Sequence, residues 1–404
     1  MALTTFEDAR QCVLDASRSA RLLDETVPVE LAYSRILAEN VSAPFALPGF
    51  DHAAMDGYAI AAPALQLPAE LIVRVVGRTL AGDPPFGPLS AGEAVQIATG
   101  AMLPQGTERV VPVESSEELD DDRVRLRLSA VASSHIRGAE DDYRSGQIAL
   151  IAGSSIGFAA SGVMASFGLR EVRVSRRPRV SVLITGSELV PAGGARTPGR
   201  IYDSNGALLR GLLLAEGLEA QMHGPLPDNA QGLRAALLAA SACSEVVITT
   251  GGASAGVADF MPRLLAELGE VLIWKVAMRP GMPLLFARIG RTLVFGLPGN
   301  PVSVVAVFLS LVRPALRVMQ GASPPLMPRA RLLHPLQKTH NRLEFRRATL
   351  SVDDQGVAQV QAHPALSSGV LRSVAESDAM ILLDAQRMRW EIGDLVEVLR
   401  YSSV

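Results

Sequence analysis

The stretch Glu245-Val-Val-Ile-Thr-Thr-Gly-Gly-Ala-Ser-Ala-Gly256 decides the fold of the central part of the chain. Its apolar and β-branched first half is typical of a strand buried on both faces, and its glycine-rich second half is typical of a turn. Val180–Ile184 is an earlier stretch of the same kind. Segments with helical spacing and capping residues follow both stretches. Together they predict a mostly parallel sheet with helices on both faces.

Residues 176–322 supply the other elements of this α/β domain. We expect a helix capped by Asp203 or Ser204 and running through Glu216, a helix capped by Asp228 or Asn229 and running through Ala240, a helix from Phe260, strands Val271–Val276 and Leu293–Gly296, and a long apolar helix Pro301–Met319. This alternation of strands and helices predicts a doubly wound sheet.

Three further regions follow different patterns. Residues 46–136 carry short alternating strands such as Leu71–Val76 and Arg123–Leu128 between turns, which predicts a small β domain. Residues 323–404 predict a C-terminal β-barrel, with strands at Arg331–Leu336, Phe345–Val352, Val357–Gln361, Ala379–Leu383 and Leu395–Leu399. Residues 1–45 and 137–175 together predict a discontinuous helical or extended linker domain, helical at Phe6–Asp15 and Leu31–Leu37.

One segment of the linker domain could imitate a membrane helix, because no charged residue falls between Arg144 and Arg170. Glycines and serines interrupt it, so we expect a strand followed by a small-residue helix packed closely inside the protein, with a membrane span as the minor alternative. The N-terminal residues lack the basic start and apolar stretch of a signal peptide. We therefore expect a cytoplasmic protein without a membrane partner.

Composition argues against several classes of protein. The 404 residues carry a net charge of −3 and only 4% aromatic residues, whereas nucleic-acid binders need basic surfaces and stacking platforms. The two cysteines, Cys12 and Cys243, are too few for a disulfide framework or a cysteine-based zinc site. We expect no nucleic-acid partner and a reducing compartment.

The glycine turn after Thr250 has three interpretations. Successive backbone N–H groups of Gly251–Gly256 could form a nest for an anion, which we rank first. A plain strand-to-helix turn is the second. The third is a nucleophile elbow with Ser254 as the nucleophile of a serine hydrolase, because Gly252–Gly256 has the G-x-S-x-G form. Its triad would need a later Asp and a histidine from His334, His340 or His363.

Charged side chains are placed where the predicted strands end. Glu188, Asp228 and Asp259 follow three of them, and Lys275 lies on a fourth. Ligands of doubly wound sheets sit beyond the carboxyl ends of the strands, so we expect these four residues at one rim. Each alone is more often a cap or a surface charge. Together with the glycine nest they suit a phosphorylated ligand held through Mg²⁺, which prefers one or two carboxylates plus phosphates.

Two Pro-Gly turns fall in one short stretch, at Met278–Pro283 and Gly296–Val302. The simple interpretation is a pair of tight hairpins. The functional one is that rigid turns hold backbone amides against a polar heterocycle.

Ten short phrases are distributed through almost the whole chain: Phe50–Ala59, Ile97–Ala101, Ala139–Asp141, Thr185–Leu189, Tyr202–Asn205, Thr250–Gly256, Lys275–Gly281, Phe295–Ser303, Arg342–Ala348 and Ser367–Ser368. Taken together, they resemble the molybdopterin molybdenumtransferase family, which includes the E domain of gephyrin. Their number and order are far more specific than any single phrase.

The resemblance implies an elongated four-part subunit that forms a homodimer, with an α/β domain that binds molybdopterin. The implied reaction uses adenylated molybdopterin and molybdate as substrates, releases AMP and is assisted by Mg²⁺. Other proteins of molybdenum cofactor assembly are possible further partners.

Phrase-to-phrase matching carries the family's functional residues onto this sequence. The implied catalytic residues are Asp56, Asp141, Glu188, Asp228, Asp259, Lys275 and Arg279, with Asp228 and Asp259 as the Mg²⁺ ligands. The implied substrate-binding residues are Thr99, Gly251, Gly252, Ser254, Gly256, Pro298, Pro301, Arg347 and Ser368. The resemblance also implies that Asp56, Thr99 and Asp141 of one subunit face the α/β cleft of the other.

The sequence departs from the family pattern at four positions. The family usually has Asp at Ser187, Lys at Arg279, Lys at Met282 and Gly at Ala139. Arg279 keeps its charge, whereas Met282 removes a cation and Ser187 removes a carboxylate. The leading hypothesis is an enzyme that inserts molybdate into adenylated molybdopterin. The second is a pterin-binding or scaffold paralogue with weakened catalysis, and the third is the serine hydrolase that would use Ser254.

Overall fold

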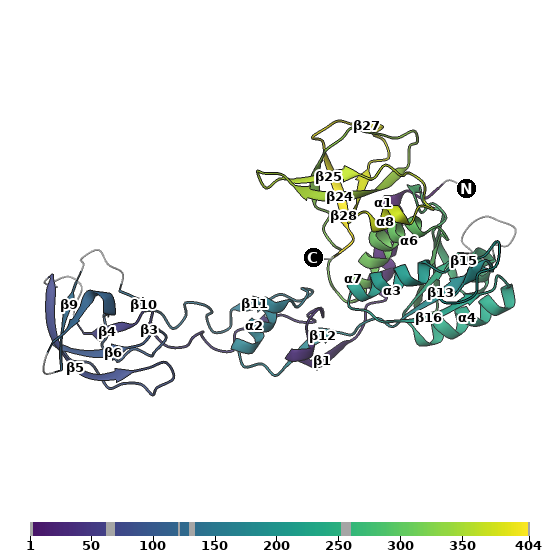
Figure 1. The fold of residues 1–404 in the computed structure, drawn as a ribbon. Coiled ribbons are helices and arrows are strands. Elements are labelled where there is room, and N and C mark those ends of the chain that lie inside the picture. The colour runs from purple at the N-terminus through teal and green to yellow at the C-terminus, as the bar shows by residue number, and fades with distance from the viewer. Residues whose placement is uncertain (1–2, 62–68, 120–121, 129–133, 252–259, 403–404) are drawn as a thin grey trace. The chain divides into compact units, whose positions relative to one another are not determined.

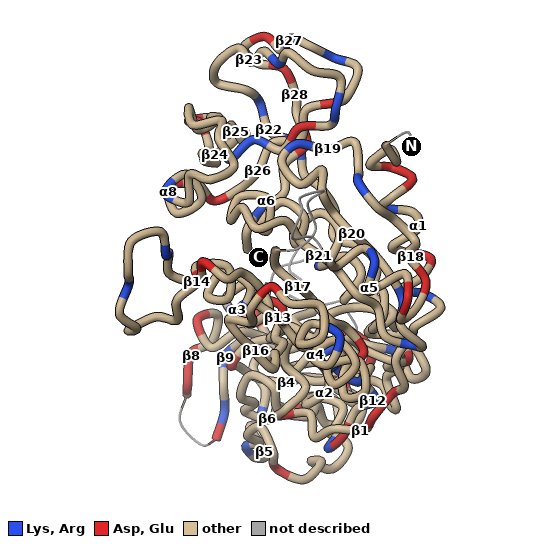
Figure 2. The backbone as a smooth tube through the Cα atoms, turned by 90° about the vertical axis from the view of Figure 1, so that its right-hand side faces the viewer, with Lys and Arg blue, Asp and Glu red and all other residues tan. Residues whose placement is uncertain are grey.

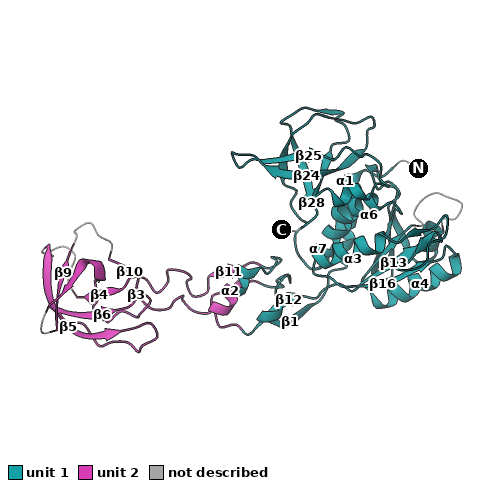
Figure 3. Ribbon diagram, viewed as in Figure 1, with its two compact units in different colours: residues 1–39, 152–161, 170–404 teal, residues 40–151, 162–169 magenta. Residues whose placement is uncertain are grey.

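The computed structural model describes residues 3–61, 69–119, 122–128, 134–251 and 260–402. The chain forms two compact units (Figure 3). The first unit comprises residues 1–39, 152–161 and 170–404, and the second comprises residues 40–151 and 162–169. Acidic and basic positions are interspersed along the described chain (Figure 2). The four domains predicted from the sequence are a finer division than these two units, and their boundaries stay a prediction.

A six-stranded sheet forms the centre of the first unit (Figure 1). Its strands are β13 (Val180–Thr185), β16 (Ala220–Leu226), β17 (Val246–Thr250), β18 (Glu270–Trp274), β20 (Leu285–Ile289) and β21 (Thr292–Leu297). Their order is β16-β13-β17-β21-β20-β18. The first four run parallel, and β20 and β18 extend the sheet through antiparallel pairs. The predicted α/β class is confirmed.

Helices cover both faces of this sheet because alternate strand residues point to opposite sides. Val182 and Ile184 belong to one buried cluster and Leu183 to another. The helix α3 (Asn205–Ala215) packs in the first cluster, and α4 (Ala230–Cys243) and α5 (Met261–Leu268) pack in the second.

The helix caps settle two alternatives that the sequence left open. Asn229 caps α4, since its side chain accepts a hydrogen bond of 2.6 Å from the Gly232 N–H. Ser204 occupies the cap position of α3, but the Asp203 carboxylate accepts the hydrogen bond, at 2.8 Å from the Gly206 N–H. Asp228 is therefore free of the capping role.

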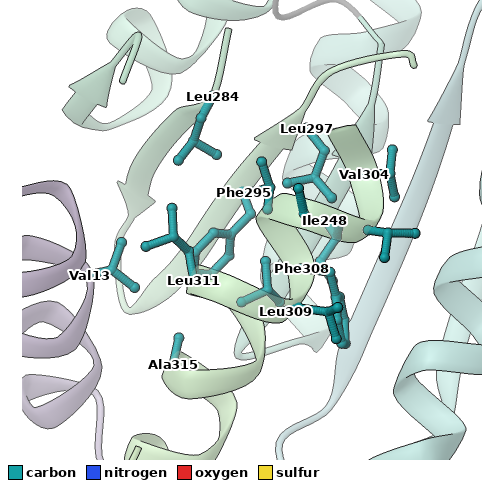
Figure 4. Close-up of a cluster of buried hydrophobic side chains, with 14 of the residues drawn as sticks. Val13, Ile248, Leu284, Phe295, Leu297, Val304, Phe308, Leu309, Leu311 and Ala315 are labelled. Carbon is teal, nitrogen blue, oxygen red and sulfur yellow. The ribbon is translucent and has the colours of Figure 1, made fainter. Parts of the chain in front are cut away.

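The long apolar helix is confirmed, although it is not uniform. It consists of α6 (Pro301–Val307), a π-helical segment η4 (Phe308–Val312) and α7 (Arg313–Met319). Pro314 has no N–H to continue the regular hydrogen-bond ladder, which accounts for wider turns just before it. Figure 4 shows the helix packed on the sheet strands and on α1 (Phe6–Ser19). It is long and apolar enough to cross a membrane, but 94% of its 18-residue apolar window is buried inside the protein.

The C-terminal strands close into a barrel, as predicted. They are β22 (Arg329–Leu332), β24 (Leu343–Val352), β25 (Ala358–Ala362), β26 (Ala379–Leu383) and β28 (Leu395–Arg400). The ring closes because β24 pairs with both β25 and β26, β28 joins β26 to β22, and β22 pairs with β25. A two-residue strand from the α/β region, β19 (Met278–Arg279), pairs in parallel with β24. Two short elements accompany the barrel, the paired strands β23 (Leu336–Gln337) and β27 (Arg389–Trp390) and the helix α8 (Arg372–Ala375).

The second unit contains the predicted small β domain. Its sheet has the order β7-β4-β6-β5-β9-β8, formed by β4 (Gly57–Ile60), β5 (Glu70–Thr79), β6 (Glu93–Ile97), β7 (Arg109–Pro112), β8 (Ser116–Glu118) and β9 (Arg123–Arg127). The unit also contains two separate two-stranded sheets: β3 (His52–Ala53) pairs with β10 (Ile136–Arg137), and β2 (Val41–Ser42) pairs with β11 (Ile148–Leu150).

The predicted helix at Leu31–Leu37 is wrong. After α1 the chain forms β1 (Asp24–Pro28), which pairs antiparallel with β12 (Glu171–Ser175), and then a 3-10 turn, Val29–Leu31. Ile36 and Leu37 bridge to Ser155 and Val174 instead of continuing a helix. The spacing of apolar residues looked helical because both faces of this extended segment supply buried side chains.

The predicted strand and helix of the charge-free segment are confirmed as β11 and α2 (Phe158–Ser166). The expected close packing inside the protein is wrong for the single chain. Only Met164 of α2 is buried, and the Phe158 side chain is 86% exposed.

Candidate active site

A cavity of about 560 Å³ in the first unit contains three of the predicted site residues, Arg279, Pro298 and Ser368. Three segments surround it: the Pro-Gly turn after β19, the turn between β21 and α6, and a barrel loop ending at Ser368. The other lining residues are Met278, Pro280, Gly281, Met282, Pro283, Asn300, Ser303, Arg342, Leu366 and Ser367. Both predicted Pro-Gly turns therefore meet at one cavity.

Two guanidinium groups give this cavity a positive charge. Arg279 is exposed, and the partly buried Arg342 has its Nη1 atom 3.4 Å from the sulfur of Met282. The described residues that line the cavity include no carboxylate. Uncompensated arginines suit an oxyanion, because a guanidinium presents several N–H donors in a planar fork.

The backbone of the first turn is fixed by β19 and by a glycine. Met278 and Arg279 are held against Leu343 and Glu344 of the barrel. Gly281 has φ of +114°, and a Cβ there would lie 2.9 Å from the Met278 and Val307 side chains. Only glycine fits this position without strain or displacement.

Hydrogen bonds tie the second turn to the barrel loop. The Asn300 side-chain amide donates to the Ser368 hydroxyl at 3.1 Å, and the Val302 N–H donates to the Ser368 carbonyl at 3.3 Å. The buried Asn205 donates to the Gly299 carbonyl at 2.7 Å. Pro301 begins α6, where its missing N–H costs nothing.

Arg347 lies behind the loop and is not among the residues that line the cavity. Its side chain is 3% exposed, and burial lowers its pKa. Its Nε donates to the Ser373 hydroxyl at 3.0 Å, and its Nη2 donates to the carbonyls of Ser367, at 3.3 Å, and Ala365. Arg347 thus anchors the loop that presents Ser368.

Asp228 and Ser187 form a reciprocal pair at the ends of β16 and β13. The Ser187 N–H donates to the Asp228 carboxylate at 2.9 Å, and the Asp228 N–H donates to the Ser187 hydroxyl at 3.1 Å. Glu188 is exposed beside them, and its carboxylate lies 2.8 Å from where a Cβ on Gly186 would sit. Asp228 thus contacts Ser187, the neighbour of Glu188 in the chain, and both carboxylates follow the ends of adjacent strands, as predicted. The short parallel strands β14 (Leu189–Val190) and β15 (Ile201–Tyr202) follow.

Lys275 lies at the same edge of the sheet but farther away. Four strand spacings of about 4.8 Å separate β13 from β18, which places their ends roughly 19 Å apart. Lys275 follows β18 with φ of +70°, and its ammonium lies 5.0 Å from the centre of the Trp274 ring. The predicted rim is therefore an extended edge and not one compact cluster.

The glycine turn begins between these two groups. Gly251 follows β17 with φ of +82°, and a Cβ there would lie 2.8 Å from the Thr185 carbonyl oxygen. Gly252, Ser254, Gly256 and Asp259 lie outside the described residues, so the choice between anion nest, plain turn and elbow stays a prediction. Two of the triad candidates have carboxylate neighbours: His340 lies 3.2 Å from Glu344, and His363 lies 3.0 Å from Glu376.

No group of three or more His, Cys, Asp or Glu side chains that could hold a metal ion occurs within the part of the chain that the structure describes. The predicted Mg²⁺ pair combines the described Asp228 with Asp259, which falls in the gap at 252–259. One carboxylate oxygen of Asp228 accepts the Ser187 N–H, and the neighbouring Glu188 supplies a second carboxylate at the same strand ends. These two carboxylates fit Mg²⁺, which takes few protein ligands and completes its coordination shell with phosphate and water.

In the second unit, Asp56 and Thr99 are in direct contact. The Thr99 N–H and hydroxyl both donate to the same Asp56 oxygen, at 2.7 Å each, and these bonds lower the pKa of Asp56. Asp141 lies on the loop after β10, which is tied back by the Ala139 N–H to Asp51 at 2.9 Å. All three predicted residues are exposed.

Sequence reasoning did not single out Arg342, Asn300 or Asn205. Arg342 stands inside a quoted phrase, but only the pairing of β19 with β24 brings it to the cavity. Asn300 could have been found from its place between the two prolines of the second turn.

Comparisons with known proteins agree along the chain. Residues 4–168 match the MoeA N-terminal region (domain I and II), residues 181–318 a probable molybdopterin binding domain, and residues 329–401 the MoeA C-terminal region (domain IV). A molybdopterin molybdenumtransferase from Haemophilus influenzae is 33% identical over 95% of this chain and 97% of its own. One from Staphylococcus aureus strain COL is 32% identical over 93% of this chain and 90% of its own.

Solved structures show the same likeness. Two crystal structures of a molybdopterin biosynthesis MoeA protein from Pyrococcus horikoshii each cover 99% of this chain and 100% of their own. Their TM-scores are 0.81 and 0.84, at 29% and 26% identity. Together with the matched regions and the order of the sequence motifs, these likenesses show that the chain belongs to the molybdopterin molybdenumtransferase family.

Proposed function

We propose that this chain inserts molybdate into adenylated molybdopterin, with Mg²⁺ assistance and release of AMP, in molybdenum cofactor biosynthesis. The observation that carries the proposal is the order of groups along the carboxyl edge of the sheet. Carboxylates follow β13 and β16, the glycine turn begins at the end of β17, and the cationic cavity lies beyond β21. One elongated anionic substrate could contact all three.

The cationic cavity is the proposed molybdate site. Two strand spacings, about 10 Å, separate the ends of β13 and β21. Arg279 and Arg342 would bind the oxyanion through charge-assisted N–H donors, and the Ser368 hydroxyl would add a neutral one. Arg342 then supplies the second cation that Met282 lacks.

The carboxylate end is the proposed Mg²⁺ site, with Asp228 and Asp259 as ligands. The ion would neutralise phosphate charge on the adenylated substrate. Ser187 supports this assignment, because its two hydrogen bonds hold Asp228 in place where the family usually has a carboxylate. Glu188 would orient the substrate or move a proton, and Lys275 would pair with a phosphate or molybdate oxygen.

Pro298 and Pro301 would keep the second turn rigid, and the glycine turn at 251–256 would hold the terminal phosphate of the pterin. Asp56, Thr99 and Asp141 would reach the cleft of a second subunit in a homodimer. We place the reaction in the cytoplasm, with other cofactor-assembly proteins as partners.

The direct test is an assay with purified chain, adenylated molybdopterin, Mg²⁺ and molybdate, in which AMP release and active cofactor are both measured. We expect release that depends on molybdate and is lost in Arg279→Gln. The matched control is Arg331→Gln, an exposed arginine on β22 outside the cavity. If the chain binds adenylated molybdopterin but releases no AMP in response to molybdate, under conditions in which another family member does, the scaffold alternative is favoured. Fluorophosphonate labelling of Ser254 would favour the hydrolase.

A further inference from the structure

A second charged cavity lies at the opposite edge of the α/β sheet, where the parallel strands begin. Its volume is about 290 Å³. Arg179, Glu245 and Arg291 line it, and each stands just before one of the strands β13, β17 and β21. Arg21, beyond the end of α1, and Arg176, after β12, complete its charged lining. The proposed reaction uses none of these residues.

The balance of charge in this cavity is strongly positive. Among the described residues that line it, four are arginines and one, Glu245, carries a carboxylate. Arg176 and Arg179 both reach Glu245 at 2.8 Å, and their hydrogen bonds and charge hold its pKa at about 2 despite the burial that opposes this. Glu245 is thus ionised and already shared. Arg21 and Arg291 have no carboxylate among the described residues that line the cavity.

Two further features fit a bound anion. Ser241 lines the cavity, and its hydroxyl is buried without a hydrogen-bond partner among the described residues, which is costly unless a ligand or water satisfies it. The Arg21 guanidinium packs against the backbone of Gly321, since a Cβ there would lie 2.5 Å from it. The position of Arg21 is therefore set by packing, and Glu245 sets those of Arg176 and Arg179.

We propose that this cavity binds a small anion that carries phosphate groups, at a site separate from the catalytic edge. Three uncompensated positive charges favour a multiply charged ligand, and arginine forks match phosphate oxygens. The volume is near the lower limit of small-molecule sites, which excludes a folded partner element and suits a diphosphate-sized group. Such a ligand would join α1, the segment before β13 and the β20–β21 hairpin, and would stabilise the folded chain by mass action.

The test is calorimetric titration of the full chain with inorganic pyrophosphate, at fixed ionic strength and with chelator to remove divalent metal. We expect binding that Arg21→Gln/Arg291→Gln weakens at least tenfold, while Arg331→Gln leaves it unchanged. Both replaced arginines are exposed, so we expect the variant to remain folded. Hydrogen exchange should show protection by pyrophosphate at residues 20–23 and 241–245.

The cationic cavity of the proposed molybdate site could also bind pyrophosphate, so the same titration is done with Arg279→Gln/Arg342→Gln. The proposal is overturned if that variant loses all binding while Arg21→Gln/Arg291→Gln binds as the parent does. It is also overturned if residues 241–245 are not protected. Citrate is the comparison ligand. If citrate binds as tightly as pyrophosphate or more tightly, with the same dependence on Arg21 and Arg291, the ligand of this cavity is a polycarboxylate and the phosphate proposal is overturned.

Discussion

Replacing Arg347 by methionine tests whether this buried side chain positions the loop that presents Ser368. The change keeps the apolar stem of the side chain but shortens it and removes its hydrogen bonds to Ser373, Ser367 and Ala365. Hydrogen bonds to a charged group contribute about 1.5–3 kcal/mol each. Part of that gain offsets the desolvation of the guanidinium, so we expect a net loss of about 3 kcal/mol in the free energy of unfolding.

The loop should also lose its fixed geometry, because two of its carbonyls lose their donor. Ser368 would then leave its place opposite Asn300, and we expect the KM for molybdate to rise by about one to two orders of magnitude, which corresponds to roughly 1.4–2.8 kcal/mol. Urea unfolding gives the stability, and AMP release at varied molybdate gives the KM.

The neighbouring Arg346 provides the matched control. It is also buried, but it binds Glu344 and the Gln337 carbonyl inside the barrel, away from the loop. Arg346→Met should destabilise the chain and leave the KM for molybdate near the parent value. If Arg347→Met lowers stability yet leaves that KM unchanged, Arg347 supports the barrel only and the positioning argument is wrong.

Four further results are expected. Arg342→Gln should raise the KM for molybdate about 10- to 100-fold, since it removes one of two cavity cations, and an unchanged KM would place the oxyanion elsewhere. Gly281→Ala should lower the free energy of unfolding, measured in urea, by about 2–3 kcal/mol, because the new Cβ would lie 2.9 Å from two side chains and φ is +114°. A loss below about 0.5 kcal/mol would contradict this expectation. The ordinary pKa of Glu245, 4.5, is lowered to about 2, so its stabilisation is complete above pH 4.5 and fades as the pH falls toward 2. Glu245→Gln should therefore flatten the dependence of the free energy of unfolding on pH in that window by roughly 1–2 kcal/mol, because solvent screens the exposed Arg179 partner; an unchanged slope would disprove the linkage. Asp56→Ala and Asp259→Ala subunits, each inactive alone, should regain activity when mixed, whereas subunit exchange without activity would rule out sites shared between subunits.

Local sequence patterns predicted most of the fold. The stretch Val180–Ile184 is β13 almost residue for residue, and Ala379–Leu383 is β26. Both are short apolar runs bounded by polar or turn residues, so their length and ends are encoded locally. Leu31–Leu37 failed because its apolar residues are buried by bridges to residues more than a hundred positions later, which spacing alone cannot reveal.

The positions of site residues that follow neighbouring strands could be predicted from the sequence. The positions of those that depend on contacts between distant strands could not. Glu188 and Asp228 follow neighbouring parallel strands, so their meeting followed from the α/β pattern. The placement of Lys275 at the far end of the edge depends on the order of six strands, which the sequence does not state. The role of Arg342 depends on β19 joining the barrel, a contact between residues over sixty positions apart.

The packing of α1 bears on how the chain folds during synthesis. Phe6 stacks edge-on against Phe345 at 5.4 Å between ring centres, and the Leu22 N–H donates to the Met319 carbonyl at 2.8 Å. A ribosome adding about 5–20 residues per second needs roughly 15–60 s to make the 300 residues between these partners. For that time the apolar face of the first helix has no native partner, while residues 40–151 can already fold. We expect nascent chains to depend on a holding chaperone, and moving α1 to the C-terminus to relieve that dependence.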